Sequence, residues 1–542
     1  MTAIRGVPEP GVYLAPTSEM PFDYAATCVM RDWRSRLVWP IAYPTYRAIQ
    51  MATNLRAIDL ITHLTDDRCR RIAILSEGQI NTLVRWLGEM ALLIEGGLRK
   101  DICFSGGPSE LRVLAGRESA PSVGAAHPAI KSAPITAFSG LRRFARALTW
   151  TRSPDQLFQT VYSPHHVAIS HNSLLIDVAR GTRTPVAFRH AQTLFQLARA
   201  RSKQGTRPES IEVAEIAGLF EALLRESYAV ADAMMERMVA LFRPAATAIV
   251  SRVASDLDSL AELPCLPRSI WAGSAGSYAT RALILEVRRR GGHVTTFDHG
   301  GSASMVDEAD ILALRECAVA DRVYMPTAAC AARVAASGTL ARDRNLNRSE
   351  IVGWKGDPSF RIRCRPRRAV RRARPRVYYP PTVFRGSRQH LPSYLPDVVY
   401  LDWQFRLVEA VHRMPVDLVC KPHPEGLLRG KPHPLAQIAC VDYRPFEDVI
   451  GDADVFLYDF PQSTTFWQAL CTDRPVILID LGITRFNSWA LNAVHRRCAV
   501  IQARWDEGNL PCIDAEALES ALCDQGRADP SEFRAALCGA SS

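Results

Sequence analysis

The sequence lacks closely spaced cysteine pairs. Its fourteen cysteines are spread from Cys28 to Cys538, with no CxxC pair and no dense cluster. Structural zinc sites need ligands at close, repeated spacing, and disulfide frameworks are typical of short secreted chains. We therefore expect reduced, mostly buried thiols.

Long apolar runs are also missing. No stretch approaches the roughly 20 apolar residues of a membrane-spanning helix, and Met1 to Gly11 lacks the basic-then-apolar order of a signal peptide. The composition, 47% hydrophobic and 23% charged, is typical of a globular protein. We expect a cytoplasmic protein, neither secreted nor embedded in a membrane.

Lysine is scarce, and the positive charge is concentrated in one segment. Only six of the 66 basic residues are lysines, and nine arginines lie between Arg361 and Arg376, which we call the arginine strap. Subtracting these nine from the formal charge of +10 leaves about +1 for the rest of the chain. The strap has no aromatic residue for stacking on bases, so we expect anionic lipid headgroups rather than nucleic acid as its partner. A solvated connector is the alternative.

Strands alternate with helices in two series, which predicts two α/β lobes joined by a linker with a site in the cleft between them. The length of 542 residues fits about three structural units or two large ones. We divide the chain into a mixed and helix-rich N-terminal region, the remainder of an N-lobe, an arginine-rich connector and a C-terminal lobe, at 1–262, 263–350, 351–376 and 377–542. In each lobe, ligands should bind outside the carboxyl ends of the strands.

Three local expectations concern the N-terminal region. Arg70 to Gly97 is predicted to be a short strand followed by an amphipathic helix. His165 to Arg180 is predicted to be a strand and a helix, capped by Asn172 or Ser173. Pro244 is expected to break a long helical segment.

The strongest motif is Lys421-Pro422-His423-Pro424, directly after the apolar segment VDLVC. A cation and an imidazole at the carboxyl end of a strand suit a phosphate. The alternative is a surface loop with a chance histidine. The same letters recur at Lys431 to Pro434, but that copy follows a glycine turn, so His423 is favoured over His433.

A second motif, Asp459 to Thr465, also follows an apolar strand and opens a helix. The hydroxyl groups of Ser463, Thr464 and Thr465, together with free backbone amides, could hold an anion. Ordinary helix capping needs no ligand and is the alternative.

A third motif, Asp298-His299-Gly300-Gly301, closes a predicted βαβ unit. His299 beside two glycines has space for a substrate and is a candidate general base for an acceptor hydroxyl. A histidine that fixes a tight turn is the alternative. Four nearby carboxylates are rival bases: Asp298, Asp307, Glu308 and Asp310.

Two further patterns are weaker. The loop from Gly273 to Ser277 does not meet the GxGxxG spacing of a dinucleotide loop, so we interpret it as close packing of a helix on a strand. Asp452-Ala453-Asp454 precedes its strand rather than ending it, so we expect no metal there.

Together, the HG motif, KPHP, the Ser/Thr loop and the segment DRPVILID resemble bacterial surface-carbohydrate transferases of GT-B type, over about Ser269 to Asp480. Families with this order of motifs include capsule-polysaccharide Kdo transferases, sialyl- and polysialyltransferases, and CDP-glycerol glycerophosphotransferases. The resemblance implies two Rossmann-like lobes, no metal, and a nucleotide-activated donor in the C-lobe. By the same resemblance, His423, Ser463 and Thr464 grip the donor phosphate with Lys421 adjacent, and His299 faces the acceptor.

The function expected from this resemblance is transfer of a sugar to a bacterial surface glycan or lipid-linked acceptor. The donor would be a CMP-activated ulosonic acid, Kdo or a sialic-acid-like sugar, with no other cofactor. The strap would hold the enzyme peripherally at the inner face of the membrane. Alternatives are a CDP-glycerol-type glycerophosphotransferase, a GT-B-like sugar epimerase and a nonenzymatic membrane adaptor.

Overall fold

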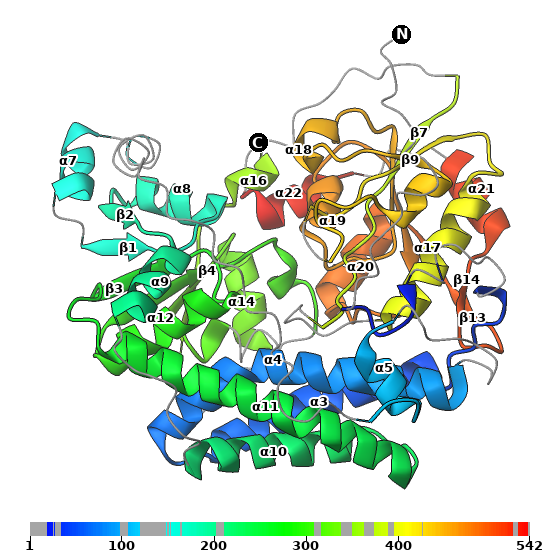
Figure 1. Ribbon diagram of the computed structural model, residues 1–542. Coiled ribbons are helices and arrows are strands. Elements are labelled where there is room, and N and C mark those ends of the chain that lie inside the picture. The colour runs from blue at the N-terminus through cyan, green and yellow to red at the C-terminus, as the bar shows by residue number, and fades with distance from the viewer. Residues whose placement is uncertain are drawn as a thin grey trace.

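The structure is a computed structural model of two α/β lobes beside a layer of long helices (Figure 1). It describes residues 19–24, 27, 34–97, 107–119, 148, 151, 153–162, 165–201, 211–307, 316–337, 349–361, 373–387, 395–424, 427–523 and 529–539. Of the predicted features, most of the arginine strap (362–372) and the candidate bases Glu308 and Asp310 lie outside these residues.

The N-lobe is built on a six-stranded parallel sheet in the order β2-β1-β3-β4-β5-β6. Its strands are β1 (His166–Ala168), β2 (Val186–Phe188), β3 (Ser269–Ala272), β4 (His293–Phe297), β5 (Arg322–Met325) and β6 (Glu350–Gly353). Its helices are α7 (Pro154–Tyr162), α8 (Ser173–Gly181), α9 (Ala191–Arg201), α12 (Tyr278–Arg289), α14 (Ala328–Ala336) and the short α16 (Pro358–Arg361). The region before residue 263 therefore supplies two strands of this sheet.

The C-lobe repeats the plan with a second six-stranded parallel sheet, in the order β12-β11-β10-β7-β8-β9. Its strands are β7 (Arg376–Tyr379), β8 (Asp417–Cys420), β9 (Cys440–Val441), β10 (Val455–Tyr458), β11 (Val476–Asp480) and β12 (Ala499–Gln502). Its helices are α17 (Asp397–Val411), α18 (Phe446–Val449), α19 (Thr464–Leu470), α20 (Ser488–Arg497), α21 (Ala515–Cys523) and α22 (Ser531–Leu537), with a 3-10 turn η6 (Pro434–Gln437). The two sheets confirm the predicted pair of α/β lobes.

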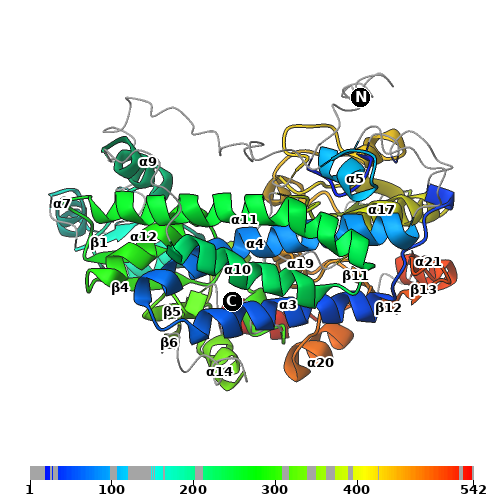
Figure 2. The same ribbon diagram turned by 60° about the horizontal axis from the view of Figure 1, so that its bottom comes forward.

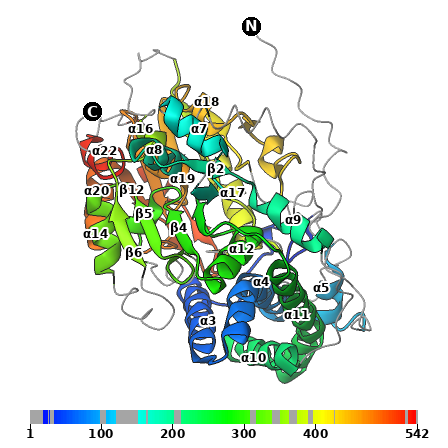
Figure 3. The ribbon, with the colours of Figure 1, turned by 90° about the vertical axis from the view of Figure 1, so that its left-hand side faces the viewer.

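Four long helices pack together and run beneath both lobes (Figures 1 and 2). They are α3 (Tyr43–His63), α4 (Asp67–Leu92), α10 (Ile211–Ser227) and α11 (Asp232–Ala261). Seen from the N-lobe side, the four helices form one bundle below the sheet (Figure 3). We call them the helical bundle.

Two local predictions in this region are wrong, and one is confirmed. Residues predicted as a strand at the start of the segment 70–97 belong to α4, which begins at the Asp66 cap and continues into a π-turn at Leu93–Gly97. The helical part of that prediction is confirmed, and the apolar run read as a strand is instead buried among the helices packed around α4. Pro244 lies inside α11 without ending it, because packing on α4 and α10 keeps the helix continuous. Asn172 caps α8 as expected.

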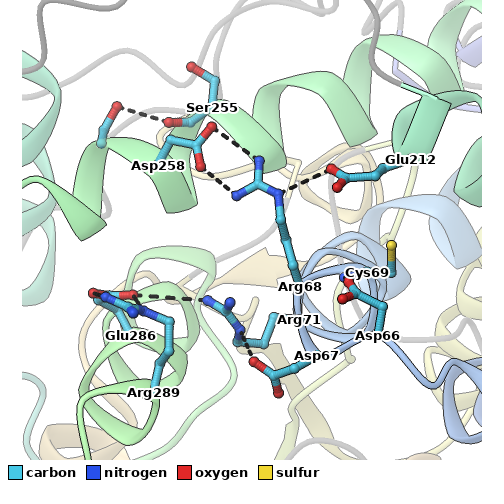
Figure 4. A network of polar contacts seen from close by, with 11 residues as sticks. Asp66, Asp67, Arg68, Cys69, Arg71, Glu212, Ser255, Asp258, Glu286 and Arg289 are labelled. Atoms are coloured by element: carbon cyan, nitrogen blue, oxygen red, sulfur yellow. Dashed lines mark hydrogen bonds and ion pairs between the residues drawn. The ribbon is translucent and has the colours of Figure 1, made fainter.

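Charged side chains of α4 connect the bundle internally and to the N-lobe (Figure 4). Arg68 binds Asp258 of α11 at 2.5 Å and Glu212 of α10 at 3.1 Å. One turn further on, Arg71 lies between Asp67 at 2.9 Å and Glu286 of α12 at 4.0 Å.

The other end of α4 reaches the C-lobe. The buried Arg85 side chain pairs with Glu89 at 2.8 Å and donates to the Gly386 carbonyl. The preceding segment also contacts the C-lobe, because the ring of Tyr43 stacks on Trp505 with 4.8 Å between centroids. The helical bundle therefore holds both lobes in one arrangement.

Among the described helices, α11 is long and apolar enough to cross a membrane by length and composition, contrary to the reading of the sequence. Core helices pass the same test, and half of its most apolar window is buried inside the protein. Along its length α11 packs against α4, α10, α9, α12 and α5.

The described cysteines form no disulfide with one another, and most are buried. No group of three or more His, Cys, Asp or Glu within the described ranges is arranged to hold a metal ion.

Candidate functional site

The two sheets meet through loops at the carboxyl ends of their strands. Gly300 follows β4 with a φ of +96°, and a Cβ atom placed there would lie 2.3 Å from Thr464 Oγ1. Thr464 follows β10 and begins α19 of the other lobe. The HG motif and the Ser/Thr loop, predicted separately from the sequence, are therefore in direct contact across the lobes.

A second contact between the lobes lies a few residues along the chain. Val306 forms an antiparallel bridge with Phe486, and the Asp307 amide donates to the Arg485 carbonyl at 2.6 Å. The Asp307 carboxylate lies 3.6 Å from the Arg485 guanidinium and is half-exposed. Asp307 is thus part of the lobe interface, where its carboxylate already faces a cation.

Asp298 is a buried carboxylate at the end of β4. Its Oδ2 accepts a hydrogen bond from the Gly301 amide at 2.9 Å, and the residue is 7% exposed. Burial raises the pKa of Asp298 to about 7, the Gly301 amide opposes this, and the charge of Asp357 adds to it. A carboxylate with this pKa can accept a proton near neutral pH.

Asp357 is a second buried carboxylate beside the same loop. It accepts from the Ser173 hydroxyl at 2.5 Å and from the Ser359 amide at 2.8 Å. Burial raises the pKa of Asp357, while the Ser173 and Ser359 hydrogen bonds and the nearby His299 lower it. Asp357 therefore interacts electrostatically with both the exposed His299 and the buried Asp298.

Asn172 fixes the backbone around this cluster. Its side-chain amide donates to the carbonyls of Gly273 at 2.8 Å and Asp298 at 2.9 Å, while its oxygen accepts from the Leu175 amide at 2.8 Å. One side chain thus joins the ends of β1, β3 and β4. The sequence indicated only the capping role, because its other partners lie more than 100 residues away.

The loop after β3 is occupied by a carboxylate of the protein itself. Glu316 accepts from the Ala275 amide at 3.0 Å and from the Ser274 hydroxyl at 3.1 Å. Gly273 packs closely on the backbone of residues 171 and 172, since a Cβ there would lie 2.8 Å from the His171 carbonyl carbon. The loop therefore has the close packing that its small residues predict.

In the C-lobe, the first KPHP copy follows β8 as predicted, but its lysine points inward. Lys421 is 4% exposed and its Nζ donates to the Pro422 carbonyl at 3.0 Å. Burial lowers the pKa of Lys421, and the charge of Asp442 opposes this. His423, in contrast, is exposed.

Both KPHP copies line one pocket of about 520 Å³. Its walls are residues 382–384, 422–424, 427–433 and Tyr443. His433 is buried: its Nδ1 accepts from the Leu435 amide at 3.3 Å, and burial lowers its pKa to about 3. The two histidines thus have different surroundings, one exposed at the pocket and one neutral inside the wall.

The Ser/Thr loop is packed on a buried polar network. Asp459 accepts from Tyr379 at 2.6 Å and from the Trp403 indole at 2.9 Å. Burial raises the pKa of Asp459 to about 6, and these hydrogen bonds oppose the rise. Ser463 caps α19 by accepting from the Thr465 amide at 3.3 Å, and their hydroxyls lie 2.7 Å apart.

The KPHP pocket and the Ser/Thr loop lie at the same edge of the C-lobe sheet but not on neighbouring strands. The first follows β8 and the second follows β10, and β7 runs between them. The fold and site together define a two-lobed α/β protein with a carboxylate cluster on one lobe and a cation-rimmed pocket on the other.

Comparisons with known proteins add little to this description. No protein-family model and no curated protein matches the chain. Among solved structures, the chain is similar to apo UGT2 of Phytolacca americana, with 10% identity and a TM-score of 0.29. The match covers 68% of this chain and 91% of that one. A likeness this weak carries no argument about function.

Proposed function

We propose that the protein is a glycosyltransferase of GT-B type that moves a sugar from a nucleotide-activated donor to an acceptor hydroxyl. The observation that carries this proposal is the contact between Gly300 and Thr464. It places the carboxyl edges of two parallel sheets against each other, and ligands of such sheets bind at that edge. An acceptor on one lobe and a donor on the other would then share one interface.

The N-lobe would supply the base. Asp298 has a pKa of about 7, and the exposed His299 is next to it in the chain. Transfer needs one proton removed from the acceptor oxygen as that oxygen bonds to the anomeric carbon. Either side chain is able to accept that proton, with Asp298 holding it on a carboxylate oxygen and His299 on a ring nitrogen.

The C-lobe would hold the donor and its leaving group. As the bond to the sugar breaks, negative charge develops on the phosphate of the departing nucleotide. His423 at the pocket, with Ser463 and Thr464 at the loop after β10, would stabilise that charge, whereas Lys421 is buried and donates to the Pro422 carbonyl. The resemblance of these motifs favours a CMP-activated ulosonic acid as donor and a bacterial surface glycan as acceptor.

A panel of nucleotides tests the proposal without knowledge of the acceptor. CMP, CDP, UDP and GDP are each added to the protein and its thermal unfolding is followed. A ligand at about 100 times its dissociation constant stabilises the folded state by about 2.7 kcal/mol, a readily visible shift. Selective stabilisation by CMP supports the proposed donor class, whereas preference for CDP would favour a CDP-glycerol-type phosphotransfer. No shift with any of the four contradicts the proposal.

A further inference from the structure

One segment of the C-lobe pocket wall is attached to the helical bundle. Residues 382–384 line the pocket, and Gly386 lies two residues further along the chain. We call residues 382–387 the wall loop. The Gly386 carbonyl accepts a hydrogen bond from the guanidinium of Arg85 in α4. Because Arg85 and Gly386 are both buried, this contact lies inside the junction between the bundle and the C-lobe.

Gly386 is packed between the pocket lining and the N-terminal segment. Its φ is +51°, and a Cβ atom placed there would overlap Leu427 Cδ1 and lie 2.7 Å from the Glu19 carbonyl oxygen. Leu427 also lines the pocket. Because a close-packed interior leaves no space for an independent shift, the position of Gly386 is coupled to that of the pocket lining.

Hydrogen bonds hold the wall loop to segments that are distant in the chain or in the next helix. The amides of residues 385–386 donate to the Asp397 carboxylate of α17, at 2.9 and 2.6 Å. The Ser387 amide donates to the Glu19 carbonyl at 2.9 Å. The indole of Trp86 in α4 donates to the same Glu19 carbonyl at 2.9 Å. Trp86 is therefore a second connection from α4 to the wall loop, through Glu19.

Arg85 is itself held in place by two residues of the bundle. Its Nη1 donates to Glu89 Oε1 at 2.8 Å, and that oxygen also accepts from the Tyr46 hydroxyl of α3 at 2.7 Å. All three side chains are buried. A buried guanidinium that uses separate nitrogens for a carboxylate and for a carbonyl is held in one orientation. Arg85 therefore connects α3 and α4 to the wall loop.

We propose that Arg85 is a positioning residue of the C-lobe pocket: it fixes the wall loop through Gly386, so that the helical bundle determines the shape of a pocket in the neighbouring lobe. The consequence for ligand affinity rests on the proposed function, which places the donor at this pocket, whereas the fixing of the wall loop does not. The competing explanation is that Arg85 only stabilises the protein as a whole, in which case its loss would loosen all C-lobe segments alike.

Hydrogen exchange at the wall loop, followed by mass spectrometry on the full chain, tests the proposal. The reporters are the amides of residues 385–387, which donate to Asp397 and Glu19. Arg85→Lys keeps a cation beside Glu89, but a single ammonium does not reproduce the two separate contacts of the guanidinium. Because local opening exposes these amides, we expect them to exchange at least tenfold faster in Arg85→Lys, with the strands of the C-lobe sheet unchanged.

A second variant leaves the buried ion pair intact. Trp86→Phe removes the indole hydrogen bond to Glu19, and it should accelerate exchange at residues 385–387 several-fold. This variant decides the question if Arg85→Lys fails to fold, because unchanged exchange in Trp86→Phe would then overturn the inference.

The control variant breaks a contact of the bundle that lies away from the wall loop. Arg68 is at the other end of α4 and binds Asp258 of α11 and Glu212 of α10. Arg68→Met should lower the stability of the protein but leave exchange at residues 385–387 at the wild-type rate. Acceleration of the same size in Arg68→Met and Arg85→Lys would mean that the wall loop responds to any weakening of the bundle, and the inference would be overturned.

Calorimetric titration with CMP measures the consequence for the pocket. We expect Arg85→Lys to weaken CMP binding several-fold and Arg68→Met to leave it unchanged. If the wild type binds no nucleotide, the proposed function fails, and the exchange at residues 385–387 still decides whether Arg85 fixes the wall loop. Wild-type exchange in Arg85→Lys, or acceleration spread evenly over the C-lobe, would overturn the inference. Unchanged CMP affinity in Arg85→Lys, when the wild type binds CMP, would overturn it as well.

Discussion

The carboxyl edges of the two sheets share a fold but differ in electrostatic character. At the N-lobe edge, Asp298, Asp357 and Glu316 are carboxylates whose pKa values burial raises. At the C-lobe edge, Arg429 and Lys431 are exposed at the pocket. Burial therefore makes the carboxyls of the N-lobe edge hold their protons to higher pH, whereas the C-lobe edge presents exposed basic side chains. Under the proposed function, the two edges would supply the two halves of a group transfer.

The largest expected effect is a loss of stability on breaking the buried ion pair at the end of α4 that contacts the C-lobe. Arg85→Met leaves Glu89 buried without its cation, with the Tyr46 hydroxyl still donating to it at 2.7 Å, and breaking a buried ion pair costs about 3–5 kcal/mol. We expect a loss of that size in the free energy of unfolding, measured by chemical denaturation. Arg56→Met in α3 of the same bundle is the control, since Arg56 and its partner Glu226 are both about half-exposed and the loss should stay below about 1 kcal/mol. Equal losses would mean that the buried contacts of Arg85 add no more to stability than an exposed ion pair.

The second effect sharpens the electrostatic contrast. Asp298 keeps its proton up to about pH 7 in the folded state, whereas in the unfolded chain it loses the proton near its ordinary value of 3.8. Between these values the folded state binds more protons, so rising pH lowers the stability that the wild type derives from this residue. We expect Asp298→Asn to gain stability over the wild type as pH rises from about 4 to 7, reaching about 3 kcal/mol. A pH-independent difference would show that this carboxyl is not perturbed.

The third effect separates chemistry from binding. Asp298→Asn should lower turnover about a hundredfold, equivalent to about 2.7 kcal/mol, with nucleotide affinity unchanged. The wild-type rate should rise with pH and level off above about 7, and the variant should lose this dependence. His299→Ala is the comparison: a loss confined to that variant would assign the base to His299 instead.

The smallest effect tests the contact between the edges. Gly300→Ala adds a Cβ at a φ of +96° and against Thr464 Oγ1, so we expect a loss of about 1–2 kcal/mol in stability. Gly291→Ala is the control, because its φ is +76° but nothing lies within 4 Å of the new Cβ. Thr464→Ala should recover part of the loss in Gly300→Ala and none of it in Gly291→Ala. Recovery in both would mean that the lobes do not meet at this point.

The two lobes and the motifs at strand ends could be predicted from the sequence, because strand–helix alternation and glycine turns are local signals. Gly300 and Thr464 were each identified in this way. It was not sufficient for Asp357 or Glu316, whose burial depends on segments distant in the chain. The orientation of Lys421 could not be predicted either, because no local sequence signal distinguishes a lysine that donates to its own loop from one that faces a ligand.

Two features of the helical bundle could likewise not be predicted from the sequence. Most residues of α4 from Ile72 to Leu92 are buried, polar ones included, because neighbouring elements cover this helix on several sides. The continuity of α11 through Pro244 likewise depends on packing with α4 and α10. Tertiary contacts decided both cases against local rules.

The most direct test of the division between the edges measures CMP affinity and donor hydrolysis in the same preparations. A CMP-activated ulosonic acid serves as donor and water as acceptor, and CMP release is followed for the wild type, Asp298→Asn and the double variant His423→Ala/Ser463→Ala. The account predicts that Asp298→Asn binds CMP normally but releases it about a hundredfold more slowly, whereas the double variant loses CMP affinity at least tenfold. Two results would contradict the account: Asp298→Asn releases CMP at the wild-type rate, or it loses as much CMP affinity as the double variant. Either result would mean that proton removal and nucleotide binding are not assigned to separate sheet edges.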